Sequence, residues 1–240
     1  MVYEDCFREI LTLSLNFSTE EPKLKAKGKS MKISGVILDA FGTIAEITRP
    51  TYPYRQLIRE CSKQGRKPRA DDIRILMTRT LPISEAASYF GIKLSSGRLK
   101  ELEDSLQEEL SSVRPFADAE DGIALLHAGD IKLAVCSNLA SPYGAVIRQL
   151  FPSIVVHGYS YELGCMKPES SIYLQTCQRL GVQPGNDFAG QGRVVMLGDS
   201  PRCDRDGPRI VGIQGFLLKR GGHSGFTSVG QFAQAILRSR

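Results

Sequence analysis

The segment that most constrains the fold of this 240-residue chain is a short apolar run, Ile33–Leu38, which ends at a carboxylate. Its length and its β-branched side chains predict a buried parallel strand. Gly42 and Thr43 follow Asp39 closely, which predicts a sharp loop after the strand. Ligands of open α/β sheets bind just outside the carboxyl ends of the strands, so chemistry is expected at Asp39. An ordinary strand that ends at an Asp-containing turn would have the same local sequence.

Strand and helix patterns alternate through the second half of the chain. We expect strands at 131–136, 154–157, 193–197 and 211–218, and helices at 121–128, 141–150, 168–180 and 228–237. Alternating β and α units of this kind predict an α/β fold, a doubly wound, Rossmann-like parallel sheet that is covered by helices on both faces.

A second region, 47–113, has the periodicity of helices. Apolar residues recur at helical spacing over 54–63, 71–80 and 99–110, which predicts an all-helical insertion directly after the first strand. We therefore expect an α/β core formed by 31–46 and 114–240, with the insertion at 47–113. Residues 1–30 are polar and lysine-rich in their second half, and we expect them to form a flexible N-terminal extension.

Composition excludes several classes of protein. No apolar run approaches the ~20 residues of a membrane helix, and acidic residues occupy the region that a signal peptide would keep positive. The net charge is +5, and much of it comes from a lysine-rich run at 23–32 without aromatic residues, which is typical of a solvated tail. Six cysteines without a C-x-x-C pair suit buried thiols in a reducing compartment. We expect a cytoplasmic protein with neither a membrane nor a nucleic-acid partner.

Three further strand ends carry polar residues. Ser137 and Asn138 follow one predicted strand, and Lys167 stands directly before a predicted helix. Asp199 follows another strand, with Asp204 about one helical turn beyond it. A capped helix, a surface lysine or an N-capping aspartate would explain each residue by itself. Because the carboxyl ends of parallel strands meet at one edge of the sheet, we expect these side chains to converge with Asp39.

The converging residue types predict a consistent chemistry. Asp39 and Asp199, without histidine or cysteine nearby in the pattern, fit a hard cation such as Mg²⁺. Ser137 and Lys167 offer a hydrogen-bond donor and a positive charge to a phosphoryl group, whose transfer depends mainly on positioning and charge neutralisation. A carboxylate can also act as a nucleophile and form an aspartyl-phosphate.

The chain resembles the haloacid dehalogenase-like (HAD) hydrolase superfamily over about 31–240. The four motifs of that superfamily occur in order as Asp-Ala-Phe-Gly-Thr at 39–43, Ser137-Asn138, Lys167-Pro168, and Gly198-Asp199-Ser200 with Asp204. The helical insertion stands where the cap domain of that family enters, so the resemblance implies a HAD core with a helical cap.

The resemblance also implies roles for these residues. Asp39 would be the nucleophile, Thr43 would shape its loop, and Ser137 and Lys167 would hold the transferred group, with Asn138 as a further residue of the catalytic site. Mg²⁺ would be bound by Asp39, the Phe41 carbonyl and Asp199, with Asp204 as a supporting carboxylate. The implied substrate is a small phosphorylated molecule.

Phe41 departs from the phosphatase pattern, in which a second aspartate at that place protonates the leaving group. An aromatic residue there, together with Ser137-Asn138 and Tyr173, resembles the dehalogenase branch of the family. Those dehalogenases work without metal and lack the aspartate found here at Asp199. We favour a Mg²⁺-dependent hydrolase that forms an aspartyl-phosphate on Asp39. The alternatives are a 2-haloacid dehalogenase and a catalytically silent protein that binds a phosphorylated ligand.

Overall fold

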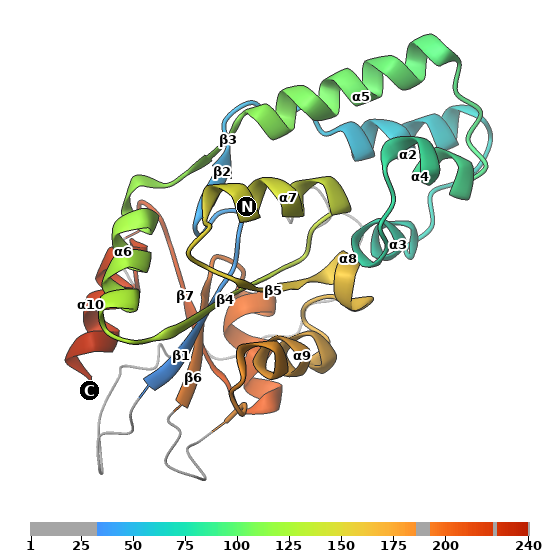
Figure 1. The fold of residues 1–240 in the computed structure, drawn as a ribbon. Coiled ribbons are helices and arrows are strands. Elements are labelled where there is room, and N and C mark those ends of the chain that lie inside the picture. Colours follow the sequence, from blue (N-terminus) through green and yellow to red (C-terminus); the bar gives the residue numbers. More distant parts are fainter. Residues whose placement is uncertain (1–32, 186–192, 223–224, 240) are drawn as a thin grey trace.

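The computed structural model describes residues 33–185, 193–222 and 225–239. The expected N-terminal extension lies outside the described residues. The described part is built on a five-stranded sheet with the strand order β5-β4-β1-β6-β7, in which all neighbours run parallel (Figure 1). The strands are β1 (Ile33–Leu38), β4 (Lys132–Ser137), β5 (Val156–Tyr159), β6 (Arg193–Gly198) and β7 (Gln214–Leu217). This architecture confirms the predicted doubly wound α/β fold.

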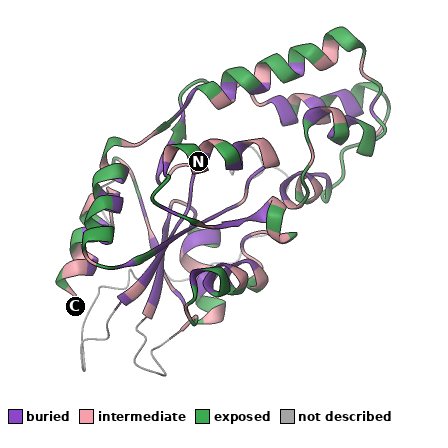
Figure 2. Cartoon of the chain, viewed as in Figure 1, coloured by how far each residue is buried: buried purple, intermediate pink, exposed green. Residues whose placement is uncertain are grey.

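Alternation along the central strand β1 distributes its side chains to two cores. Val36 and Leu38 join the cluster that contains α6 (Ala117–Ala128), α7 (Ser141–Leu150) and α10 (Val229–Arg238). Ile37 joins the cluster of the opposite face, which contains α9 (Ser170–Leu180). Because β1 is covered on both faces, its residues from Val36 to Leu38 are all apolar and buried, and they form a continuous apolar run in the sequence. The buried strands and the exposed outer faces of the helices are visible in Figure 2.

Four helices form the insertion at one side of the sheet (Figure 1). They are α2 (Pro53–Lys63), α3 (Asp72–Thr78), α4 (Ile83–Tyr89) and α5 (Ser96–Ser111). A short antiparallel ribbon of β2 (Ala45–Ile47) and β3 (Val113–Pro115) connects them to the core. The sequence analysis found neither the ribbon nor α4, although it found α3, which is as short as α4. The three-residue strands of the ribbon have too little periodicity to be recognised. The insertion meets the core where α3 contacts α8 (Ser160–Leu163) and α5 contacts α7.

Several predicted boundaries were wrong, among them the start of the helix expected at 121–128, which begins at Ala117. The strand expected at 154–157 begins at Val156, because Ile154 closes a turn by donating its N–H to the Phe151 carbonyl. The strand expected at 211–218 begins at Gln214, since a 3₁₀ turn, η2 (Pro208–Val211), and the left-handed Gly212 come first. The helix expected from position 168 begins at Ser170. Apolar composition alone does not separate a strand from the turn that leads into it.

Two statements from composition can be compared with the structure. Five cysteines lie in the described part of the chain, and all five are buried and free, as expected. Among the described residues, no helix combines the length and the apolar character that crossing a membrane requires.

Candidate active site

The register of the sheet brings three strand ends together. Leu38, the last residue of β1, pairs with Val135 of β4 and with Leu197 of β6. The next residue, Asp39, continues this ladder by donating its backbone N–H to the Leu197 carbonyl at 3.0 Å. Asp39 therefore lies at the carboxyl edge of the sheet, between the end of β4 at Ser137 and the end of β6. Three of the predicted strand ends are adjacent.

Lys167 lies at the centre of the cluster. Its Nζ atom donates to Asp39 Oδ1 and to Asp204 Oδ1, each at 2.7 Å. The lysine side chain is only 3% exposed, and Asp204 is completely buried. Burial disfavours the ammonium, but the neighbouring Asp204 and Asp39 outweigh it and keep the pKa of Lys167 well above its ordinary value. Lys167 therefore provides a fixed positive charge beside Asp39.

Asn138 holds the backbone of Lys167. Its Nδ2 atom donates to the Lys167 carbonyl at 3.0 Å, and its Oδ1 atom accepts from the Lys167 N–H at 2.8 Å. Both ends of the amide are thus engaged by one residue, 29 positions away in the chain. Asn138 was predicted to belong to the catalytic site, and its amide contacts the backbone of the lysine that was expected to hold the transferred group.

Three carboxylates lie close together beside this lysine. Asp39, Asp199 and Asp204 each place an oxygen atom within 4.8 Å of the others. Burial raises the pKa of Asp204 above its ordinary range against the opposing charge of Lys167, and the charge of Asp39 adds to the increase. Even with a proton on Asp204, one lysine does not balance the carboxylates of Asp39 and Asp199, so the site has an excess of negative charge. An all-oxygen donor set with that excess fits a divalent cation such as Mg²⁺.

Glycines allow these carboxylates to approach the backbone. Gly42 has a left-handed φ of 81°, and a Cβ atom at this position would overlap the Asp199 carboxylate. Gly198, at the end of β6, lies in the same way against the side chain of Asp204. A side chain at either position would push an aspartate away from the cluster.

Thr43 closes the loop that follows Asp39. It is completely buried, and its hydroxyl has no hydrogen-bond partner among the residues that the structure describes. Its carbonyl accepts from Arg220 Nη2 at 2.6 Å, and Arg220 pairs with Asp118. The sequence analysis missed Arg220 and Asp118, because the contact joins positions 177 and 102 residues apart and belongs to no recognised motif.

Ser137 occupies the expected place at the end of β4. It is 3% exposed, and within the described part of the chain its hydroxyl has no hydrogen bond that would prevent it from binding a ligand. The preceding residue, Cys136, is not a competing nucleophile, because burial raises the pKa of its thiol to about 12. The nucleophile of this cluster is therefore best sought among its carboxylates.

Phe41 cannot supply a proton, and its ring packs against the core. The ring is half-buried and meets Tyr143 of α7 edge to face, with the ring centroids 5.8 Å apart. Tyr143 is a second residue that the sequence analysis missed, since it occupies an ordinary apolar position of α7. Tyr173, the other residue shared with the dehalogenase pattern, is buried and donates its hydroxyl to the Cys203 carbonyl at 2.6 Å.

The helical insertion contains a separate cavity of about 390 Å³. It lies between α2 and α5 and is lined by Thr51, Tyr52, Arg55, Gln56, Arg59, Glu60, Lys63 and Arg98. None of these residues belongs to the aspartate cluster, so cavity size does not identify the reactive centre. The cluster is the candidate active site because three carboxylates, a buried lysine and the end of β4 at Ser137 meet there.

Comparisons with known proteins agree with this arrangement. The family model described as haloacid dehalogenase-like hydrolase matches residues 33–212. No curated protein sequence matches the chain. A HAD phosphatase from Thermococcus onnurineus is 20% identical with a TM-score of 0.58, and the match covers 85% of this chain and 98% of that one. A 2-haloacid dehalogenase from Pseudomonas syringae pv. Tomato DC3000 is 18% identical with a TM-score of 0.59, covering 87% of this chain and 100% of that one. Such identities establish the fold, and the reaction must be argued from the residues.

Proposed function

The chain belongs to the haloacid dehalogenase-like hydrolase family, and from this premise we propose that it is a Mg²⁺-dependent phosphatase of small phosphorylated metabolites. The observation that carries the proposal is the cluster of three carboxylates, two of which contact one buried lysine. A dehalogenase that works without metal needs no such excess of acids. Repulsion among Asp39, Asp199 and Asp204 is relieved when a cation binds between them.

In this proposal Asp39 is the nucleophile. One of its oxygen atoms attacks phosphorus, a new O–P bond forms, and the ester P–O bond breaks with its electron pair going to the leaving oxygen. Lys167 and the Ser137 hydroxyl hold the phosphoryl oxygens while charge redistributes among them. Water then attacks the aspartyl-phosphate, which releases phosphate and restores Asp39. Thr43 and Asn138 act by positioning, Thr43 through the loop and Asn138 through Lys167.

The cation fits the residues that surround the attack position. Asp39, Asp199 and the Phe41 carbonyl would hold Mg²⁺, with Asp204 as the buried supporting carboxylate. When bound, Mg²⁺ would neutralise the developing negative charge of the phosphoryl group. Lys167 already offsets part of the carboxylate charge of Asp39 through its contact with Oδ1.

The helical insertion takes the role of a cap in this proposal. Residues 47–113 would cover the site and select the leaving group, while 31–46 and 114–240 would form the catalytic core. The partner is then a small molecule rather than a nucleic acid or a membrane. The cytoplasm, a reducing compartment, fits the five described cysteines, which are buried and free.

Phe41 favours a second candidate, a hydrolase of 2-haloacids. In that reaction Asp39 would attack the carbon that bears the halogen, and halide leaves without a proton, so no acid is required at position 41. Asp199 argues against this candidate, because it would add an unbalanced carboxylate beside the nucleophile. A catalytically silent protein that binds a phosphorylated ligand is the third candidate.

The deciding experiment assays a panel of phosphorylated metabolites and 2-chloropropionate, each with Mg²⁺ and with a chelator. We expect phosphate release that requires Mg²⁺, with the phosphoryl group trapped on the peptide that contains Asp39. Asp39→Asn keeps the size of the side chain but removes the nucleophile, so turnover should fall by several orders of magnitude. Halide release that persists in chelator would identify the dehalogenase. Ligand binding without any trapped intermediate would identify the silent protein.

A further inference from the structure

Glu109 is a completely buried carboxylate far along the chain from every residue of the active site. It lies near the C-terminal end of α5, where the insertion returns to the core. A buried carboxylate is destabilising unless hydrogen-bond donors surround it, so its partners show what it holds in place.

The first partners of Glu109 belong to the segment by which the chain enters the insertion. Its Oε2 atom accepts from the backbone N–H of Thr51 at 2.5 Å and from that of Tyr52 at 2.6 Å. The Thr51 hydroxyl contributes a third hydrogen bond at 3.2 Å to the same oxygen. Glu109 thereby connects the segment between β2 and α2, by which the chain enters the insertion, to the C-terminal end of α5, by which it leaves. We call this region, next to the β2–β3 ribbon, the hinge.

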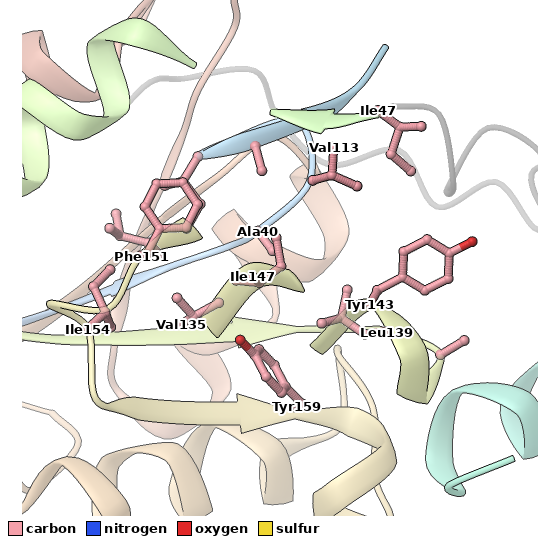
Figure 3. Close-up of a cluster of buried hydrophobic side chains, with 14 of the residues drawn as sticks. Ala40, Ile47, Val113, Val135, Leu139, Tyr143, Ile147, Phe151, Ile154 and Tyr159 are labelled. Atoms are coloured by element: carbon pink, nitrogen blue, oxygen red, sulfur yellow. The ribbon is translucent and has the colours of Figure 1, made fainter. Parts of the chain in front are cut away.

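The last partner comes from the core. Tyr143 of α7 donates its hydroxyl to Glu109 Oε1 at 2.5 Å, and both side chains are buried. Figure 3 shows that the Tyr143 hydroxyl points away from the apolar cluster around Ala40 and Val135. In each of these hydrogen bonds, from Thr51, Tyr52 and Tyr143, Glu109 is the acceptor, as an acceptor-only carboxylate requires.

The ring of Tyr143 completes a path to the reactive centre. It meets Phe41 edge to face, with the planes 89° apart, and Phe41 is two residues after Asp39. A rigid, well-packed ring transmits a displacement to its neighbour rather than absorbing it. Movement of the hinge at Thr51 and Tyr52 would therefore move the loop that carries the nucleophile.

We propose that Glu109 and Tyr143 are a positioning pair. Together they set the orientation of the helical insertion and the position of Phe41 in the loop that follows Asp39. The inference rests on the proposed function only in naming Asp39 as the reacting residue. Neither side chain needs to touch the substrate. Their effect is geometric, and a misplacement of about 1 Å far from the chemistry can lower a rate about 10²-fold.

The test removes one atom from the pair. Tyr143→Phe keeps the ring and its contact with Phe41 but removes the donor to Glu109. The matched control is Tyr54→Phe, because the Tyr54 hydroxyl is likewise buried but donates to the Leu81 carbonyl at 2.8 Å, inside the insertion. Both variants lose one buried tyrosine hydrogen bond, so a general loss of stability would affect both alike.

Two readouts separate positioning from stability. Hydrogen exchange of the hinge, 45–52 and 112–115, is measured by mass spectrometry without substrate and should be faster in Tyr143→Phe than in wild type and Tyr54→Phe. The value of kcat/KM for the best substrate of the panel should fall about 10- to 100-fold in Tyr143→Phe, and less than threefold, on the order of 0.6 kcal/mol, in Tyr54→Phe. Equal hinge exchange in the two variants, or equal activity, would overturn the proposal.

A double variant tests whether the pair acts as a unit. Glu109→Gln combined with Tyr143→Phe should reduce kcat/KM no further than Glu109→Gln alone, because both changes break the same bond. Additive losses would contradict the proposal. If Glu109→Gln does not fold, the comparison of Tyr143→Phe with Tyr54→Phe still decides. The hinge measurement needs no substrate, so a failed phosphatase assay rejects the proposed function without affecting this result.

Discussion

Phe41 is the residue whose chemistry departs most from that of the proposed reaction. A benzyl group neither donates nor accepts a proton, and general acid catalysis contributes about 10²–10⁴ in rate. Alkyl phosphates, whose leaving groups need that proton, should therefore be slow substrates. Acyl phosphates and p-nitrophenyl phosphate should be much faster, because their leaving groups are stable anions.

Phe41→Asp tests this explanation directly. The new carboxyl group would lie in the loop beside Asp39, and we expect the turnover of alkyl phosphates relative to p-nitrophenyl phosphate to rise at least tenfold. Phe41→Asn is the matched control, since it has nearly the same shape, loses the same ring contact with Tyr143 and has no acid. An equal ratio in both variants, or alkyl phosphate turnover of tens per second in wild type, would show that another residue supplies the proton.

Asp199 separates the metal-dependent reaction from the metal-free one. Asp199→Asn removes a charged hard ligand from the cluster, so the Mg²⁺ concentration at half-maximal activity should rise by at least about tenfold. Asp206→Asn is the control on the following helical turn, where the carboxylate pairs with Arg205 and Arg209 and lies outside the cluster. A metal titration that Asp199→Asn leaves unchanged would favour the dehalogenase candidate.

At this scale the sequence predicted which residues meet, but not what each one contacts. Strand ends of a parallel sheet converge by topology, so Asp39, Lys167 and Asp204 could be placed together in advance. The hydrogen bonds of Asn138 to Lys167 could not be foreseen, because they depend on the path of a loop rather than on a period. The same holds for Glu109, whose helical periodicity placed it on the polar face of α5.

At the scale of elements, strong periodicity predicted well and short segments did not. The five strands and the main helices were recognised because each buries a face with a period of 2 or 3.6 residues. The β2–β3 ribbon, only three residues per strand, was missed although it forms the hinge. Turns before β5 and β7 were included in the strands, since a buried turn is as apolar as a buried strand.

The strand β5 contains a histidine that should make stability depend on pH. His157 is buried at the sheet edge, and this burial, with the Arg148 guanidinium nearby, lowers its pKa to about 4. Arg179 opposes the charged form as well, and Glu162 favours it. The histidine of the unfolded chain has a pKa of about 6.5, so between about pH 6.5 and pH 4 the unfolded chain binds a proton that the folded chain does not bind. Stability is complete above about pH 6.5 and falls as the pH decreases toward 4.

Urea denaturation at pH 7 and pH 5 measures this loss. His157→Gln cannot titrate in this range, so its free energy of unfolding should fall less between the two pH values than that of wild type. The difference between a pKa of about 6.5 and one of about 4 corresponds to a loss of about 3 kcal/mol at most. About half of that loss is expected between pH 7 and pH 5. His127→Gln is the control, because His127 is exposed on α6. Parallel losses in wild type and His157→Gln would refute the role of His157.

At the scale of the whole molecule, the insertion meets the core at two places of different character. One is the buried contact of Glu109 with Tyr143 at the hinge. The other is an exposed ion pair at the opposite rim, where Arg74 of α3 pairs with Glu169, and the second contact of its guanidinium, Nη2 to Oε2, measures 3.1 Å. Glu169 is two residues after Lys167, so this pair reaches the core beside the active site. A buried contact at the hinge and an exposed ion pair at the rim would suit the cap proposed above, which would open and close over the site.

The rim pair leads to a prediction about cap closure. Exposed ion pairs contribute about 0–1 kcal/mol, which corresponds to at most about fivefold in the closed population, and salt screens them. Arg74→Glu should therefore lower kcat/KM about fivefold or more, because it replaces attraction with repulsion. Glu169→Arg in the same chain should restore most of the loss by reversing the pair. Lys100→Glu is the control, since Lys100 forms an exposed pair with Asp104 within α5, inside the insertion. Salt at 1 M should also lower the activity of wild type, because it screens the pair. If Arg74→Glu behaves like Lys100→Glu, or if the reversed pair fails to restore the lost activity, the rim contact does not govern closure.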